Sequence, residues 1–235
     1  MHVDVVEKRL ASLPILSRQG RRINGLYRLL GCSKIWEQAY EAVARNAGAL
    51  TPGVTPRTFD KFSIERLDGI IAKVKEGRYR FRPTRRQYIP KTNGKLRPLG
   101  IPDADDKLVQ GAVKLVLEQI YEPIFSHQSH GFRPGRSCHT ALASIQKTWA
   151  GTVWLVEADI AGFFDNIDHD ILLDLLRRRI DDERFLKLIR GMLKAGYLEN
   201  WRWHETYSGT PQGGKWIAIH LPPYEHAWQM PSVSL

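Results

Sequence analysis

One stretch of the chain, residues 152–168, constrains the fold more than any other. It begins with strand-forming residues at 153–156 and is broken soon afterwards at Gly162. Asp159 lies where such a strand would end, a position that we expect to be buried. Because a buried carboxylate is costly unless it is paired or binds a metal ion, one interpretation is that Asp159 is a metal ligand. The other interpretation is that Asp159 caps the following turn, and spacing alone supports both.

The balance of charge predicts a polyanionic partner. The 235 residues include 35 Lys and Arg against 25 Asp and Glu, which gives a net charge of +10 and an isoelectric point near 9.7. Such an excess favours nucleic acid over a membrane surface, and no apolar run approaches the length of a membrane span. With 43% hydrophobic residues, the chain can bury the core of one large domain or two small ones.

Cysteine and histidine usage predicts neither disulfides nor zinc. Cys32 and Cys138 are the only cysteines, so we expect a reducing, intracellular compartment, and the N-terminus lacks the apolar core of a secretory signal. His127, His130 and His139 lie near Cys138, but their spacing matches none of the usual zinc patterns.

Residues 73–97 form the most basic segment, with ten Lys and Arg and a single acid, Glu76. Tyr79, Phe81 and Tyr88 alternate with the basic residues, a combination that suits phosphate contacts and stacking on bases or sugars. The alternative interpretation is a solvated basic face with no ligand. The residues that we expect to contact nucleic acid are Arg78, Arg80, Arg82, Arg85, Arg86 and Lys95, together with Arg133 and Arg136, which precede a predicted helix and form a candidate anion site.

A β-hairpin is predicted inside this basic segment. Asn93-Gly94, a strong signal for a two-residue turn, separates the candidate strands 87–90 and 95–99. Pro90 and Pro98 restrict these strands to the edge of a sheet, since proline cannot donate a backbone hydrogen bond.

The rest of the chain is predicted to be mainly helical. Residues 1–33 read as a basic arm with some helix, and Asp103, Asp105 and Asp106 read as capping acids rather than catalytic ones. The expected elements are helices over about 33–46, 60–76, 103–122, 138–149, 168–180 and 181–195, a strand over 201–207 with exposed aromatic residues, and a Gly-rich turn over 209–214.

Several motifs, in this order, resemble the group II intron reverse transcriptases, also called maturases. The resemblance covers roughly residues 34–214. The matching stretches are Arg85–Pro102 (RRQYIPKTNGKLRPLGIP), Asp106–Gln110 (DKLVQ), Tyr121–Leu142 with its core GFRPGRSCHTAL, Leu155–Asp168 (LVEADIAGFFDNID) and Gly209–Gly214 (GTPQGG).

The resemblance implies a Mg²⁺ site and a place for the incoming nucleotide. Asp159 and the backbone carbonyl of Ile160 match the positions that bind Mg²⁺ in such polymerases, where metal ions stabilise charge during phosphoryl transfer. Phe164 matches the ring that lies under the incoming sugar and excludes a 2′-hydroxyl.

The resemblance also implies residues that hold the triphosphate and the template. Lys91 and Arg97 match the groups that bind the triphosphate, a role that Lys95 could share. Gln212 matches a residue that orients the nucleotide and the template.

The chain departs from the family after Gly214. A two-metal site of this family needs a Tyr-Ala-Asp-Asp type motif, yet no Asp follows Asp182, and residues 215–235 do not resemble the apolar helix that normally comes next. We therefore expect a truncated or frame-shifted copy that is inactive alone.

These observations predict an α+β fold, the fingers and part of the palm of a right-hand reverse transcriptase, with helices on a small, mainly antiparallel sheet. The expected organisation is a basic N-terminal extension (1–59), fingers and partial palm (60–214) and an aberrant tail (215–235). The expected partners are group II intron RNA, an RNA template with a DNA primer, and deoxynucleoside triphosphates. We expect a bacterial cytoplasmic location, with an organelle as the alternative. The alternative function is a non-catalytic module that binds intron RNA.

Overall fold

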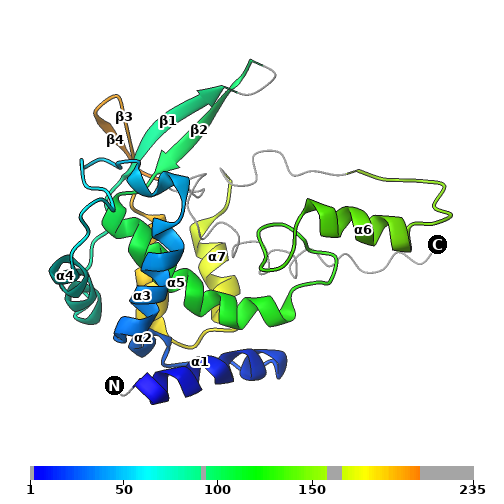
Figure 1. The fold of residues 1–235 in the computed structure, drawn as a ribbon, viewed down its shortest axis with the longest axis horizontal. Helices are drawn as coiled ribbons and strands as arrows, with labels where there is room; N and C mark the ends of the chain where they lie inside the picture. The colour runs from blue at the N-terminus through cyan, green and yellow to red at the C-terminus, as the bar shows by residue number, and fades with distance from the viewer. Residues whose placement is uncertain (1–2, 91–93, 158–165, 207–235) are drawn as a thin grey trace.

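The computed structural model describes residues 3–90, 94–157 and 166–206. Helices pack around one core and a small sheet lies at one end of them (Figure 1), so the predicted α+β class is confirmed. The elements are α1 (Val3–Arg18), α2 (Leu26–Leu29), α3 (Ser33–Ala44), η1 (Ala47–Leu50), α4 (Ile64–Lys75), β1 (Thr84–Pro90), β2 (Leu96–Ile101), α5 (Ala104–Tyr121), η2 (Glu122–Ile124), α6 (Cys138–Thr148), α7 (His169–Arg177), α8 (Glu183–Leu193), β3 (Tyr197–Glu199) and β4 (Arg202–His204).

Helix α5 lies at the centre of the core. It is apolar on most of its circumference, and Leu108, Val113 and Leu117 are almost completely buried. A helix that is apolar nearly all round must be covered on several sides, and both α1 and α3 pack against it. Trp36 of α3 is fully buried in the same core, and its indole N–H donates to the Leu30 carbonyl at 2.8 Å.

The N-terminal segment is packed into this core. Leu13 of α1 and Leu26 of α2 are completely buried, and the Ser17 hydroxyl donates to the carbonyl of Ile120 in α5. Ile23 forms an isolated parallel bridge with Ile180, through hydrogen bonds of 2.8 Å to the backbone of the α7–α8 connection. The predicted basic arm is therefore two helices that form part of the main body.

The sheet has the strand order β2-β1-β3-β4. Strands β1 and β2 pair antiparallel with Pro90 opposite Leu96, which confirms the predicted hairpin, although this register does not fit the predicted two-residue turn at Asn93-Gly94. Strand β3 pairs antiparallel with β4. The pairing of β1 with β3 is parallel and joins only Thr84 and Arg85 to β3. The Pro90 end of β1 is consequently paired on one side only, where a proline is tolerated.

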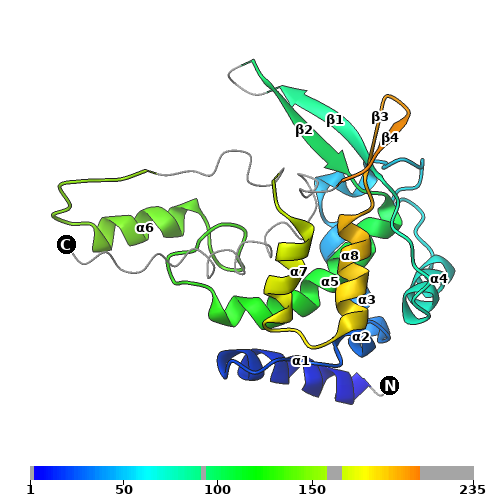
Figure 2. The same cartoon turned by 180° about the vertical axis from the view of Figure 1, so that it is seen from behind.

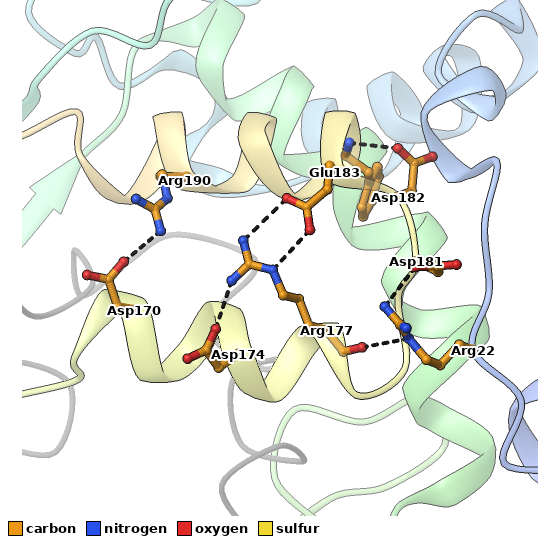
Figure 3. Close-up of polar contacts among 9 residues, drawn as sticks. Arg22, Asp170, Asp174, Arg177, Asp181, Asp182, Glu183 and Arg190 are labelled. Atoms are coloured by element: carbon orange, nitrogen blue, oxygen red, sulfur yellow. Dashed lines mark hydrogen bonds and ion pairs between the residues drawn. The ribbon is translucent and has the colours of Figure 1, made fainter.

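Helices α7 and α8 begin within two residues of the predicted starts and are joined by ion pairs. The Asp168 carboxylate accepts from two amides of α7, and the Asp182 carboxylate accepts from the Phe185 amide of α8. Between the two helices, Arg177 pairs with Glu183 at 3.0 Å and Arg190 pairs with Asp170 at 2.7 Å (Figure 3). Their apolar faces complete the core.

The central prediction for residues 153–156 is wrong in this structure. These residues form no strand, and Val153, Trp154 and Val156 are 85%, 87% and 90% exposed. A strand needs a hydrogen-bonded neighbour to be stable, and no described strand pairs with this segment. The four strand-forming side chains are therefore insufficient by themselves.

Helices α4 and α6 begin directly after capping serines, Ser63 and Ser137. Helix α4 starts at Ile64, four residues later than predicted, because Ser63 caps it by accepting from the Arg66 amide. Helix α6 starts at Cys138 as predicted, behind a capping box of Ser137 and Thr140. Among the described residues, no helix has the length and apolar content needed to cross a membrane.

Candidate nucleic-acid interface

The hairpin of β1 and β2 extends away from the helical body (Figures 1 and 2). Of the predicted triphosphate and nucleic-acid residues that the structure describes, it carries Arg85, Arg86, Lys95 and Arg97. Arg97 lies on β2 opposite Ile89, and its side chain is exposed, as is that of Lys95. Tyr88 is 47% exposed on β1, and its hydroxyl donates to the Glu199 carboxylate. The hairpin thus presents positive charge and an aromatic ring to solvent, as the sequence predicts.

Arg86 joins the hairpin to the second half of the sheet. Its guanidinium lies 4.2 Å from the ring centre of Tyr197, and the His204 ring stacks on Tyr197 with ring centres 4.9 Å apart. Aromatic faces combined with a guanidinium are the groups on which unpaired bases stack. This sheet face, which we call the aromatic face (Arg86, Tyr88, Tyr197 and His204), can therefore contact a single strand.

Arg85, in contrast, makes internal contacts. Its guanidinium donates to the carbonyls of Pro52 and Gly53, at distances of 2.9 to 3.1 Å. Gly53 itself lies so close to the start of α5 that an added Cβ would be 2.7 Å from the Asp103 amide nitrogen. Arg85 thus fixes the loop at 52–53 against the hairpin, although the sequence suggested a nucleic-acid contact.

Two of the three acids at the start of α5, Asp103 and Asp105, pair with arginine side chains. The capping prediction is correct for position only, because Asp103 is the N-cap residue but makes no side-chain cap hydrogen bond. The Asp103 carboxylate accepts from Thr55 and lies 3.3 Å from the Arg82 guanidinium, and Asp105 pairs with Arg66 at 2.6 Å. Asp103 and Asp105 therefore act as counter-ions of Arg82 and Arg66.

Asp106 is the most perturbed of these acids. It is 2% exposed, accepts from the Tyr79 hydroxyl at 2.7 Å and accepts from the Arg82 amide at 3.0 Å. Burial raises the pKa of Asp106 to about 7, although the two hydrogen bonds act in the opposite direction. Burial, together with Asp106, likewise raises the pKa of Tyr79 far above its usual value. No local pattern in the sequence indicates this pair, because Tyr79 and Asp106 lie 27 residues apart.

Arg78 and Arg80 lie in the segment that connects α4 to β1. Arg78 pairs with Glu76, the only acid of the basic segment, whereas Arg80 is exposed and contacts only backbone carbonyls, those of Gly77 and Tyr79, among the described residues. Arg80 therefore keeps its charge available to an anion, and the charge of Arg78 is partly neutralised.

Arg133 and Arg136 also differ in how far their charges are neutralised by neighbouring groups. Arg133 is buried against Glu122, with 2.9 Å between Nη2 and Oε1, and also donates to the carbonyls of Ser126 and Ser129. Within the described ranges, Arg136 donates only to the His127 carbonyl, at 3.3 Å. Arg133 is thus held by its own loop, and the predicted anion contact is compatible with Arg136 alone.

Five predicted site residues lie outside the described residues: Asp159, Ile160, Phe164, Lys91 and Gln212. The donors assigned to the metal ion, a carboxylate and a backbone carbonyl, are hard oxygen ligands that fit a divalent cation. In the described ranges, no three His, Cys, Asp or Glu side chains gather closely enough to hold a metal ion.

Comparison with known proteins agrees with the motif order. The family described as reverse transcriptase (RNA-dependent DNA polymerase) matches residues 89–217. The group II intron-encoded protein LtrA of Lactococcus lactis subsp. cremoris is 53% identical over 190 residues, which cover 80% of this chain and 32% of LtrA. An uncharacterized 91 kDa protein in the cob intron of Schizosaccharomyces pombe is 49% identical over 175 residues, covering 74% of this chain and 22% of that protein.

The same comparison supports the fold. A chain of a partial Cas6-RT-Cas1–Cas2 complex superposes with a TM-score of 0.55 at 18% identity, over 86% of this chain and 34% of that chain. This likeness concerns the fold alone. The chain spans about a third or less of these two relatives and of this structure. From the motif order, the hairpin and the match over residues 89–217, we conclude that the chain belongs to the reverse transcriptase (RNA-dependent DNA polymerase) family and resembles its group II intron members.

Proposed function

We propose that this chain forms the fingers and part of the palm of an RNA-directed DNA polymerase of a group II intron, with a maturase role in splicing. The observation that carries the proposal is the exposed basic hairpin, with Arg97 and Lys95 on a segment that belongs to the family-matched region. Reverse transcriptases act on nucleic acid and nucleotides, both polyanions, and the charge of +10 suits such substrates.

The proposed cofactor is Mg²⁺, held by the Asp159 carboxylate and the Ile160 carbonyl. A bound divalent cation supplies charge stabilisation during phosphoryl transfer. Lys91 and Arg97 would bind the triphosphate, Phe164 would lie under the sugar, and Gln212 would orient the nucleotide against the template. The aromatic face would hold unpaired template bases by stacking.

The proposed partners are group II intron RNA, an RNA template with a DNA primer, and deoxynucleoside triphosphates. The names of the relatives, an intron-encoded protein and a protein in an intron, support intron RNA as the partner. We propose the bacterial cytoplasm as the location.

Primer extension tests the polymerase proposal. The 235-residue chain is compared with the same chain extended by the remaining palm sequence of the Lactococcus relative, on an RNA template with a DNA primer and Mg²⁺. We expect DNA synthesis by the extended protein and none by the 235 residues alone, because one carboxylate cannot hold two metal ions in the required geometry. An extended protein that folds and binds RNA but incorporates no nucleotide would contradict the proposal.

A second candidate function is a non-catalytic module that binds intron RNA. It is favoured by the described part of the chain, in which backbone pairing forms the basic hairpin and ion pairs of Arg66 and Arg82 with Asp105 and Asp103 hold the neighbouring segments. RNA binding without any synthesis in the extended protein would select this function.

A further inference from the structure

A second basic surface lies on α8, and none of its residues belongs to the hairpin. Arg184 and Lys187 lie in α8, and Lys194 is its C-cap residue. Their spacings of three and seven residues place them on one side of the helix, away from its buried apolar side. Over the ten residues from Arg184 to Lys194, an α-helix rises by about 15 Å. We call this row of three residues the α8 stripe.

A groove with a volume of about 640 Å³ lies beside the α8 stripe. One wall is α8 itself, and the other is the segment 76–81 that joins α4 to β1. Tyr27 of α2 lies at the end of the groove near Arg184, whose guanidinium is 4.4 Å from the Tyr27 ring centre. In Figure 2, α8 runs along the helical body toward β3 and β4, while the hairpin points away from the body.

The charge of this groove is strongly positive. Its lining contains Arg80, Arg190 and the three residues of the α8 stripe, against the single acid Glu76. Glu76 is already paired with Arg78, and Arg190 is paired with Asp170 of α7 (Figure 3). In the part of the chain that the structure describes, Lys187 and Lys194 have no acidic partner. An uncompensated row of cations in a hollow attracts anions.

Gly191 lies in the α8 wall of the groove, opposite Phe81. Position 191, between Lys187 and Lys194, is a glycine in the interior of α8, where glycine is less favourable than alanine. An added Cβ there would lie 3.6 Å from the Phe81 ring, which lines the opposite wall. The absence of a Cβ at position 191 therefore leaves space between α8 and the Phe81 ring.

The length of the α8 stripe and the aromatic lining of the groove distinguish a polyanionic strand from a small anion as the ligand. A small anion would be satisfied by two or three converging cations, whereas the α8 stripe spreads its charge over about 15 Å. Tyr79 and Phe81 line the groove together with Arg80, and their rings can contact sugars or unpaired bases. From this arrangement we infer that the groove binds the phosphodiester backbone of an RNA strand, as a second RNA contact separate from the hairpin. The inference rests on the proposed function only in that the chain binds RNA.

A charge-reversal experiment on the full 235-residue chain tests this site. The probe is a fluorescein-labelled, single-stranded RNA of about twenty nucleotides, and anisotropy gives its affinity at several KCl concentrations. The test variant is Lys187→Glu with Lys194→Glu, and Lys187→Gln with Lys194→Gln is a milder second pair. The matched control is Arg45→Glu with Arg178→Glu, which changes the net charge equally at exposed positions outside the groove. Circular dichroism melts establish that each variant folds.

The α8 reversal should lower RNA affinity at least ten-fold and reduce the slope of log affinity against log salt by about 1.4, or about 0.7 for each lost contact. The Gln pair should lie between it and the wild type, and the control should change affinity less than three-fold. Inorganic phosphate, added at constant ionic strength, should not displace the RNA. Displacement by phosphate would identify a small-anion site and overturn the RNA assignment. Unchanged salt-dependent binding by the folded α8 variant would overturn this inference alone, whereas a wild-type chain without RNA affinity would overturn the proposed function as well.

Discussion

The Tyr79 hydroxyl donates a 2.7 Å hydrogen bond to the buried carboxylate of Asp106 and so joins the basic fingers segment to the first turn of α5. The same carboxylate accepts from the Arg82 amide, two residues before β1 begins. Asp106 thereby positions the chain that enters the hairpin. These contacts link the core helix to the segment that enters the proposed nucleic-acid interface. The pKa of the Asp106 carboxyl is about 7.

Asp106→Asn should change how stability depends on pH. Burial raises the pKa of Asp106 from 3.8 to about 7, so the folded protein binds this proton more tightly than the unfolded chain does. The stabilisation is complete below pH 4 and is lost as the pH rises through about 7. Between pH 5 and pH 8 the wild type should therefore lose up to about 3 kcal/mol of unfolding free energy relative to Asp106→Asn. Urea unfolding of both proteins at the two pH values measures this difference, and a difference independent of pH would refute the assignment.

Tyr79→Phe should remove one of the two donors to Asp106. Because a buried acceptor that loses its donor is costly, we expect a loss of about 1–3 kcal/mol of unfolding free energy at pH 8. At pH 5 the loss should be smaller, since a protonated Asp106 needs fewer donors. The measurement is again urea unfolding, and Tyr88→Phe, at an exposed position, is the matched control. Equal losses in the two variants would contradict the special role of Tyr79.

Leu13→Ala tests whether the N-terminal segment is part of the core. Leu13 is fully buried in α1, so its truncation should cost about 2–5 kcal/mol of unfolding free energy. Ile15→Ala, on the exposed side of the same helix, should change stability by less than about 0.5 kcal/mol. Similar small effects of both substitutions would mean that α1 is a loose arm.

Arg86→Glu combined with Arg97→Glu should weaken RNA binding through the hairpin. Each lost phosphate contact should lower the slope of log affinity against log salt by about 0.7–0.9. Arg85 is left unchanged because it holds the loop at 52–53, and its reversal would confound folding with binding. Salt titrations of RNA anisotropy measure the effect, with Arg45→Glu plus Arg178→Glu as the control. RNA binding that keeps its slope would exclude the hairpin from the interface.

Local signals in the sequence were sufficient to predict the elements that are stabilised by local contacts. Asp168 and Asp182 cap the helices predicted over 168–180 and 181–195, and β1 and β2 form the predicted hairpin, in which Gly94 has φ of +76°. Caps and tight turns depend on a few neighbouring residues, and these can be recognised in the sequence.

Features that depend on distant parts of the chain could not be predicted in this way. The residues at 153–156 have strand propensity but no described neighbouring strand, and the acid at position 106 looked like a capping residue until the fold brought Tyr79 to it. The same applies to Arg133, whose counter-ion Glu122 lies across a loop. The groove beside α8 also depends on distant segments, because its other wall, residues 76–81, lies about a hundred positions earlier in the sequence.

The most direct test of the proposed polymerase is RNA-templated primer extension by the extended protein, with Asp159→Ala beside Glu157→Ala. Glu157 is an exposed carboxylate two residues upstream, so its loss controls for a change of charge in the same segment. Removal of a metal ligand should cost several kcal/mol of transition-state stabilisation, a rate loss of roughly 10³-fold or more for Asp159→Ala. Glu157→Ala should retain the rate within about three-fold, and both variants should bind RNA as the wild type does. Synthesis that survives Asp159→Ala at the wild-type rate would contradict the proposed metal site and, with it, the proposed chemistry.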